Sequence, residues 1–146
     1  MASAASVSAR PRSLQAMPGI RLAVILTLGF GITLHTYTAT MLASDFHAGF
    51  WVWSISPYLV VALMFLTGRL RLAVLGAGIL PAIVDLLVHF AVFHAPQGST
   101  AALGLVAAPL WNLVLFMPLG GVLGWLLDRR VLRSGANHTL SQEAKP

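Results

Sequence analysis

An acidic residue, Asp85, lies in the middle of a long apolar stretch, and a histidine, His89, follows it four residues later. Residues four apart in an α-helix lie on the same face, so the two side chains would point the same way. In a membrane-spanning helix an ionised carboxylate costs about 2.5–3.5 kcal/mol, and an ionisable residue there is a candidate for function. The apolar residues around Asp85 offset this cost, so insertion by itself does not require a paired carboxylate.

A short sequence similarity adds His35 to this group. The residues Arg21–Val24 (Arg-Leu-Ala-Val) recur as Arg71–Val74, and His35 and Asp85 each follow fourteen residues after the shared arginine. If both copies begin helices of the same direction, His35 and Asp85 lie at the same depth. The similarity also allows two helical hairpins in the same orientation, a parallel repeat, although apolar sequences also repeat by chance.

Small and polar residues also form stripes along other apolar stretches of the chain. We therefore expect His35, Asp85 and His89 to meet inside a helical bundle, with Asn112 or Tyr58 within reach. The stripe on the first stretch consists of Thr27, Gly31, His35 and Thr38.

Three kinds of chemistry fit this candidate polar site. A buried Asp beside a His can be a structural hydrogen bond between helices, or it can handle protons or line a substrate path. Imidazole and carboxylate together also suit a divalent transition metal, with His35, Asp85 and His89 as ligands, and two facing histidines would suit haem. By the helical period, His94 would point about 140° away from His89.

Composition decides what kind of protein can carry such a site. Only 9% of the 146 residues are charged, against about 25% in soluble domains, and the mean hydropathy is +0.84. There are no cysteines, which excludes disulfides, Cys-ligated zinc and Cys nucleophiles. No hydrolytic triad, phosphate loop, dinucleotide fingerprint or zinc-protease motif occurs, so the sequence predicts no enzyme.

Four apolar stretches are long enough to cross a bilayer. They run over about 20–43, 51–67, 72–94 and 101–127, with short connections between them. Short connections make sequential helices antiparallel neighbours, so we expect an all-α, up-down-up-down bundle of four transmembrane helices. Residues 1–19 would form a disordered tail, and residues 128–146 a basic one.

The basic residues predict the orientation. They fall before the first stretch, between the second and third, and after the fourth: Arg10, Arg12 and Arg21, then Arg69 and Arg71, then Arg129, Arg130, Arg133 and Lys145. The positive-inside rule places both termini in the cytoplasm, as in a multi-pass protein of the bacterial inner membrane. The net charge of +5 then faces lipid headgroups rather than nucleic acid. Two alternatives stay open: a mitochondrial transit peptide, and a cleaved signal peptide within the first stretch.

The fourth stretch ends in a GxxxG pattern. Gly120 and Gly124 lie on one face, which predicts close packing against a helix of the bundle or of a second copy. The sequence thus favours a non-enzymatic membrane protein, an accessory or self-associating subunit whose partners are lipid, other membrane subunits or itself. The alternative is a proton- or metal-coupled carrier, or a haem or metal redox subunit, that uses the Asp/His site.

Overall fold

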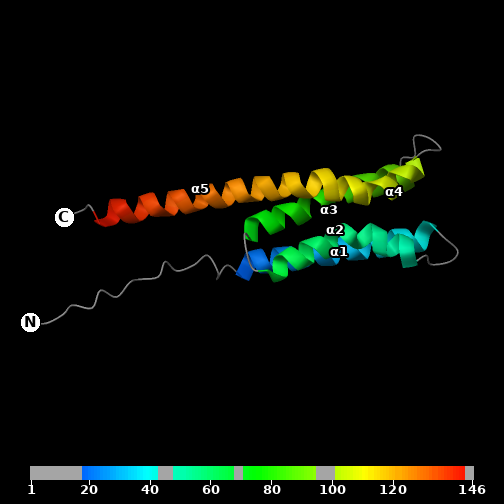
Figure 1. Cartoon of the computed structure of the whole chain (residues 1–146), viewed down its shortest axis with the longest axis horizontal. Helices are drawn as coiled ribbons and strands as arrows, with labels where there is room; N and C mark the ends of the chain where they lie inside the picture. The colour runs from blue at the N-terminus through cyan, green and yellow to red at the C-terminus, as the bar shows by residue number, and fades with distance from the viewer. Residues whose placement is uncertain (1–17, 43–47, 68–70, 95–100, 144–146) are drawn as a thin grey trace, which may run out of the picture.

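The computed structural model describes residues 18–42, 48–67, 71–94 and 101–143, and nearly all of them are helical. The elements are α1 (Pro18–Leu42), α2 (Ala48–Leu66), α3 (Arg71–Phe93), α4 (Ala101–Trp111), the π-helical turn η2 (Asn112–Phe116) and α5 (Met117–Glu143). Successive helices run in opposite directions, with α4, η2 and α5 forming one continuous rod, so that α1 begins and α5 ends at the same end of the bundle (Figure 1). The predicted all-α, up-down-up-down bundle is confirmed.

The helix boundaries lie close to the predicted ones except at the end of the fourth helix, and the start of α2 is at Ala48 rather than at position 51. Pro18 and Gly19, predicted to belong to the N-terminal tail, already form the first residues of α1. Part of the predicted basic tail is helical, because α5 continues to Glu143 and runs on past the other helices (Figure 1). The rest of both predicted tails, residues 1–17 and 144–146, lies outside the described residues.

The π-helical turn η2 lies directly before a proline. The backbone N–H of Met117 bonds to the carbonyl of Asn112, five residues back instead of four. Pro118 follows immediately, and a proline ring has no N–H to continue the helical hydrogen bonding. Single π-turns inside α-helices are rare and often occur at functional sites.

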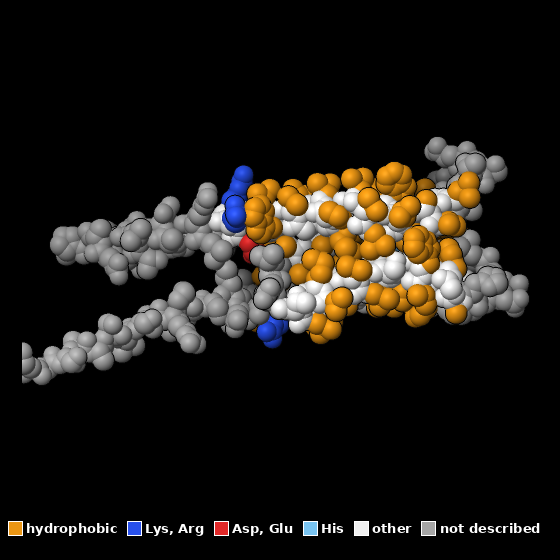
Figure 2. Space-filling view, viewed as in Figure 1, with side chains coloured by type: hydrophobic (Ala, Val, Ile, Leu, Met, Phe, Trp, Pro, Cys, Tyr) orange, Lys and Arg blue, Asp and Glu red, His pale blue; other side chains and the backbone are white. Residues whose placement is uncertain are grey.

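The surface of the bundle is apolar along most of its length. Large exposed hydrophobic side chains occur on every span, for example Leu26, Leu63, Leu87 and Val114, and Figure 2 shows them over the whole visible face of the bundle. All four spans are long and apolar enough to cross a membrane. The architecture is that of a small multi-pass membrane protein.

Charged side chains gather at one end of this surface, which we call the basic end. Arg21 of α1 and Arg129 and Arg130 of α5 are exposed there beside Asp128. Among the side chains that the structure describes, Asp85 is the one Asp, Glu, Lys or Arg that lies away from this end.

Close helix contacts form where the glycines lie. Gly120 packs against Gly76 of α3, and Gly124 packs against the backbone of Leu72. A Cβ at either α5 glycine would overlap a carbonyl of α3, so only glycine allows this approach. The GxxxG face therefore lies inside the bundle, against α3, rather than on a surface open to a second copy.

Candidate functional site

Asp85 is the centre of a buried polar cluster to which every span contributes one side chain. The Tyr58 hydroxyl of α2 donates to Asp85 Oδ2 over 2.7 Å, and His35 Nε2 of α1 lies 2.9 Å from the same oxygen. Asn112 Nδ2, in the first residue of η2, donates to Asp85 Oδ1 over 2.6 Å. We call these four residues the Asp85 cluster. All of them are at least nine-tenths buried, and Asp85 itself is 3% exposed.

A glycine on α1 makes room for the tyrosine of this cluster. A Cβ at Gly31 would overlap the ring of Tyr58, so the absence of a side chain lets α2 bring that ring between α1 and α3. The ring then lies against His35, one turn further along α1, with centroids 5.6 Å apart. Gly31 and His35 of α1 therefore hold the Tyr58 ring, and its hydroxyl bonds to Asp85.

The fourth member, Asn112, has one hydrogen-bonding atom unused. Its amide nitrogen donates to Asp85. In the described part of the chain, its Oδ1 is the one buried side-chain oxygen or nitrogen without a hydrogen-bond partner. Asn112 is 0% exposed. An unpaired acceptor so deep costs about 1–3 kcal/mol, and native proteins retain few such groups. The cluster thus has one free acceptor for a further donor.

His89 belongs to a second polar layer, further from the basic end. Its Nδ1 lies 3.0 Å from the hydroxyl of Thr38 on α1. That hydroxyl also donates to the carbonyl of Leu34 over 2.9 Å. A hydroxyl has one proton to donate, so Thr38 must accept from His89, whose Nδ1 then carries a hydrogen.

The His89 ring touches other rings at this end of α3. It lies 4.7 Å from Phe93 and 6.2 Å from His94, between centroids. The helical period predicted that His94 faces away from His89. His94 follows the last residue of α3, its backbone N–H still bonds to the carbonyl of Phe90 four residues back, and the two rings nevertheless lie edge to face. His94 is exposed, whereas His89 is buried.

The predicted site residues therefore fall into two groups. His35, Tyr58 and Asn112 all contact Asp85, whereas the recorded hydrogen bond of His89 is to Thr38. Thr38 was not among the predicted site residues, although its place three residues after His35 puts it on the same face of α1. In the residues that the structure describes, no group of three His, Asp or Glu side chains is arranged to hold a metal ion. Metal binding by His35, Asp85 and His89 stays a prediction.

An apolar layer closes the cluster toward the basic end. It consists of Val24, Val61, Val74, Ala77 and Met117, which come from α1, α2, α3 and α5 and are packed together. Along each span these residues lie between the cluster and the basic end, since Val24 precedes His35 and Met117 follows Asn112. Among the described residues, fully buried polar side chains thus continue from Asp85 in the opposite direction, to Thr38 and His89.

Asp85 and His35 can share one proton in two ways. Burial in lipid favours a pair with no net charge, because an isolated charge is costly in an apolar medium. Two forms meet this condition: an ionised Asp85 beside a doubly protonated His35, or a protonated Asp85 beside a neutral His35. They differ by one proton moved across the 2.9 Å contact. Tyr58 and Asn112 donate to the two oxygens of Asp85 and so hold its carboxyl group in place.

No protein-family model, curated protein or solved structure matches this chain.

Proposed function

We propose that this small membrane protein handles protons, as a proton-coupled carrier or as the proton-handling subunit of a larger membrane complex. Asp85 and His35 hold the exchangeable proton, and Tyr58 and Asn112 position the carboxylate. One observation carries the proposal: a buried Asp–His pair lies within the membrane-spanning bundle and is contacted by side chains from every span.

Two further features support exchange over a purely structural hydrogen bond. The first is the unused acceptor of Asn112, which is available for a hydrogen bond from a water or a substrate donor beside the carboxylate. The second is the polar layer of His89 and Thr38, with the exposed His94 beside it. These groups offer protons a route from the end opposite the basic one, and the apolar layer around Val61 blocks the other direction.

Infrared difference spectroscopy of the protein in lipid tests the proposal directly. Loss or gain of a proton changes the charge of the Asp85–His35 pair, so we expect a buried carboxyl band that changes with pH in the wild type. Asp85→Asn should abolish this band. Asp128→Asn makes the same chemical change at the basic end and should leave it unaltered. A spectrum in which the Asp85→Asn protein and the wild type show the same pH-dependent bands would refute proton exchange at Asp85.

A second candidate is the accessory subunit favoured by the sequence. The observation behind it is the length of α5, which ends at Glu143 although the candidate membrane span ends at Arg130. An isolated helix this short is marginally stable in water, so a partner protein would stabilise it. Truncation after Arg133 should then release a membrane partner from the purified complex without unfolding the bundle. If the truncated and full-length proteins purify with the same composition, this extension holds no partner.

The metal and haem alternatives have their own measurement. Protein purified from cells grown with added transition metals would be examined for bound metal and for a visible absorption band. A stoichiometric metal that Asp85→Asn abolishes would replace the proton proposal with a metal one.

A further inference from the structure

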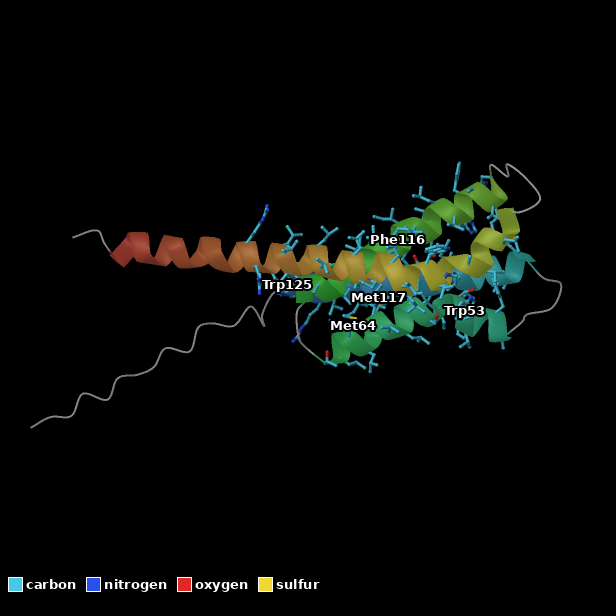
Figure 3. The ribbon with its side chains drawn as sticks, turned by 45° about the horizontal axis from the view of Figure 1, so that its top comes forward. Trp53, Met64, Phe116, Met117 and Trp125 are labelled. Carbon is cyan, nitrogen blue, oxygen red and sulfur yellow. The ribbon has the colours of Figure 1, made fainter. Side chains whose placement is uncertain are left out.

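An apolar groove lies between α2 and α5 near the basic end. Its volume is about 420 Å³, and it opens toward the outside of the bundle. Figure 3 shows Met64 of α2 opposite Met117 and Trp125 of α5, which form its two sides. Its remaining lining residues are Ala73, Ala77, Pro118, Gly121 and Val122.

The groove follows from where α2 is attached. The buried residues of α2 end at Val61, and its anchors lie before that point: Tyr58 bonds to Asp85, and Trp53 Nε1 donates to the carbonyl of Val106 over 3.0 Å. Toward the basic end, by contrast, α5 follows α3, held close by the glycines. The second half of α2 is therefore not drawn against α5.

A small residue at position 121 leaves the groove deep. A Cβ at Gly121 would meet only ordinary contacts, at 3.8 Å from the Ala73 carbonyl and from the Ala77 side chain. Position 121 thus has room for a side chain, unlike positions 120 and 124. That space is available to a ligand.

The end of the groove nearest the headgroups carries a positive charge. The guanidinium carbon of Arg129 lies 3.8 Å from the centroid of the Trp125 ring, which lines the groove. Arg129 is exposed, and a guanidinium group can bind a phosphate through two parallel hydrogen bonds. Arg130 and Arg21 are exposed at the same end, and Asp128 is the one acidic side chain described there.

We propose that this groove binds one anionic phospholipid, with an acyl chain between α2 and α5 and the phosphate on Arg129. The apolar lining matches the chain, and its volume lies within the range of about 300–1,000 Å³ typical of small-ligand sites. The charge at its mouth matches the headgroup, because basic residues near the membrane surface attract anionic lipids. This site is separate from the Asp85 cluster and does not depend on its function.

The test is lipid retention by the full-length protein. The protein would be reconstituted in phosphatidylcholine containing phosphatidylglycerol, extracted gently, and examined by native mass spectrometry for bound lipid. We expect one phosphatidylglycerol per chain, retained in preference to phosphatidylcholine. Arg129→Gln should weaken retention about fivefold, the effect of one basic residue at a membrane surface. Arg130→Gln removes the same charge at nearly the same depth, but about 140° round the helix from Trp125, and should have a smaller effect.

A second pair of variants tests the groove itself. Gly121→Leu should fill the groove and abolish retention. Gly29→Leu adds the same side chain to a glycine with open space around it and should retain lipid as the wild type does. Arg129 is exposed, so its substitution remains a valid test even if Gly121→Leu unfolds. Equal retention of both lipids, or equal losses in Arg129→Gln and Arg130→Gln, would show diffuse attraction to the membrane surface and overturn the proposal.

Discussion

Replacing Asp85 separates the structural role of the cluster from its role with protons. Asp85→Leu removes the acceptor for three hydrogen bonds, from His35, Tyr58 and Asn112. Hydrogen bonds between membrane helices are worth about 0.6 kcal/mol each on average. Three of them give a loss of about 2 kcal/mol in the free energy of unfolding, and more if the abandoned donors find no water, since each unpaired buried donor costs about 1–3 kcal/mol.

Asp85→Asn should behave differently because of the unused oxygen on Asn112. The new amide oxygen can still accept from Tyr58 and His35. Its nitrogen would face the amide nitrogen of Asn112, and a flip of the Asn112 amide turns the unpaired Oδ1 toward it. All three contacts therefore survive, with neutral acceptors in place of a charged one, and we expect a loss within about 1 kcal/mol.

Unfolding in mixed micelles, followed by circular dichroism, measures both losses. Asp128→Asn serves as the control for removing a carboxylate outside the cluster. If Asp85→Leu is as stable as the wild type, the cluster does not hold the helices together. If Asp85→Asn is as unstable as Asp85→Leu, the charge itself holds them, and the reasoning from the Asn112 flip is wrong.

The remaining predictions concern helix contacts and orientation. Gly124→Leu should lower the free energy of unfolding by at least about 1–3 kcal/mol, the usual cost of overpacking, because the new side chain meets the backbone of Leu72; micelle unfolding measures this. Gly31→Ala should displace Tyr58 from Asp85 and destabilise by a similar amount, with a changed tyrosine signal in the near-ultraviolet spectrum. Reporter fusions should place both chain ends in the cytoplasm and Gln97 on the opposite side, as the basic residues predict.

Gly29→Leu is the control for both glycine substitutions, since nothing lies within 4 Å of a Cβ there. Equal stability of this control and Gly124→Leu would mean that the α3–α5 contact is not close. A near-ultraviolet spectrum unchanged by Gly31→Ala would mean that Tyr58 does not depend on that glycine. A C-terminal reporter outside the cytoplasm would overturn the orientation.

The sequence predicts the spans well because lipid imposes one strong requirement, about 20 apolar residues per crossing. It predicts the end of the fourth helix poorly for the same reason. Hydropathy marks where the membrane ends, near Leu127, but not where helical hydrogen bonding ends, and α5 continues to Glu143. The π-turn at Asn112 is also absent from any hydropathy pattern, because it is a change in backbone hydrogen bonding within an apolar stretch.

Within the site, the depth argument predicts the pairing of His35 with Asp85, and the two are hydrogen-bonded. The same register contains the partner of His89: since α1 and α3 run parallel, the residues opposite position 89 are close to position 38, where Thr38 lies. His89 and Asp85 share one face of α3, and this fact alone did not show that His89 bonds to Thr38 instead of joining the Asp85 cluster. The groove between α2 and α5 has no sequence signal, because it depends on how far two helices diverge beyond their last contact.

Helices in lipid gain little from apolar contact with one another, since the lipid tails are as apolar as their side chains. A particular arrangement must then come from directional or very close contacts. The Asp85 cluster supplies the first kind, because turning any one span by a single residue, about 100°, moves its polar side chain away from the carboxylate. The α3 contacts of Gly120 and Gly124 supply the second kind. A residue that fixes all four rotations would be retained even without any role in proton exchange, so the burial of Asp85 alone does not distinguish the two roles. The distinction rests on Asp85→Asn, which preserves the contacts and removes the proton.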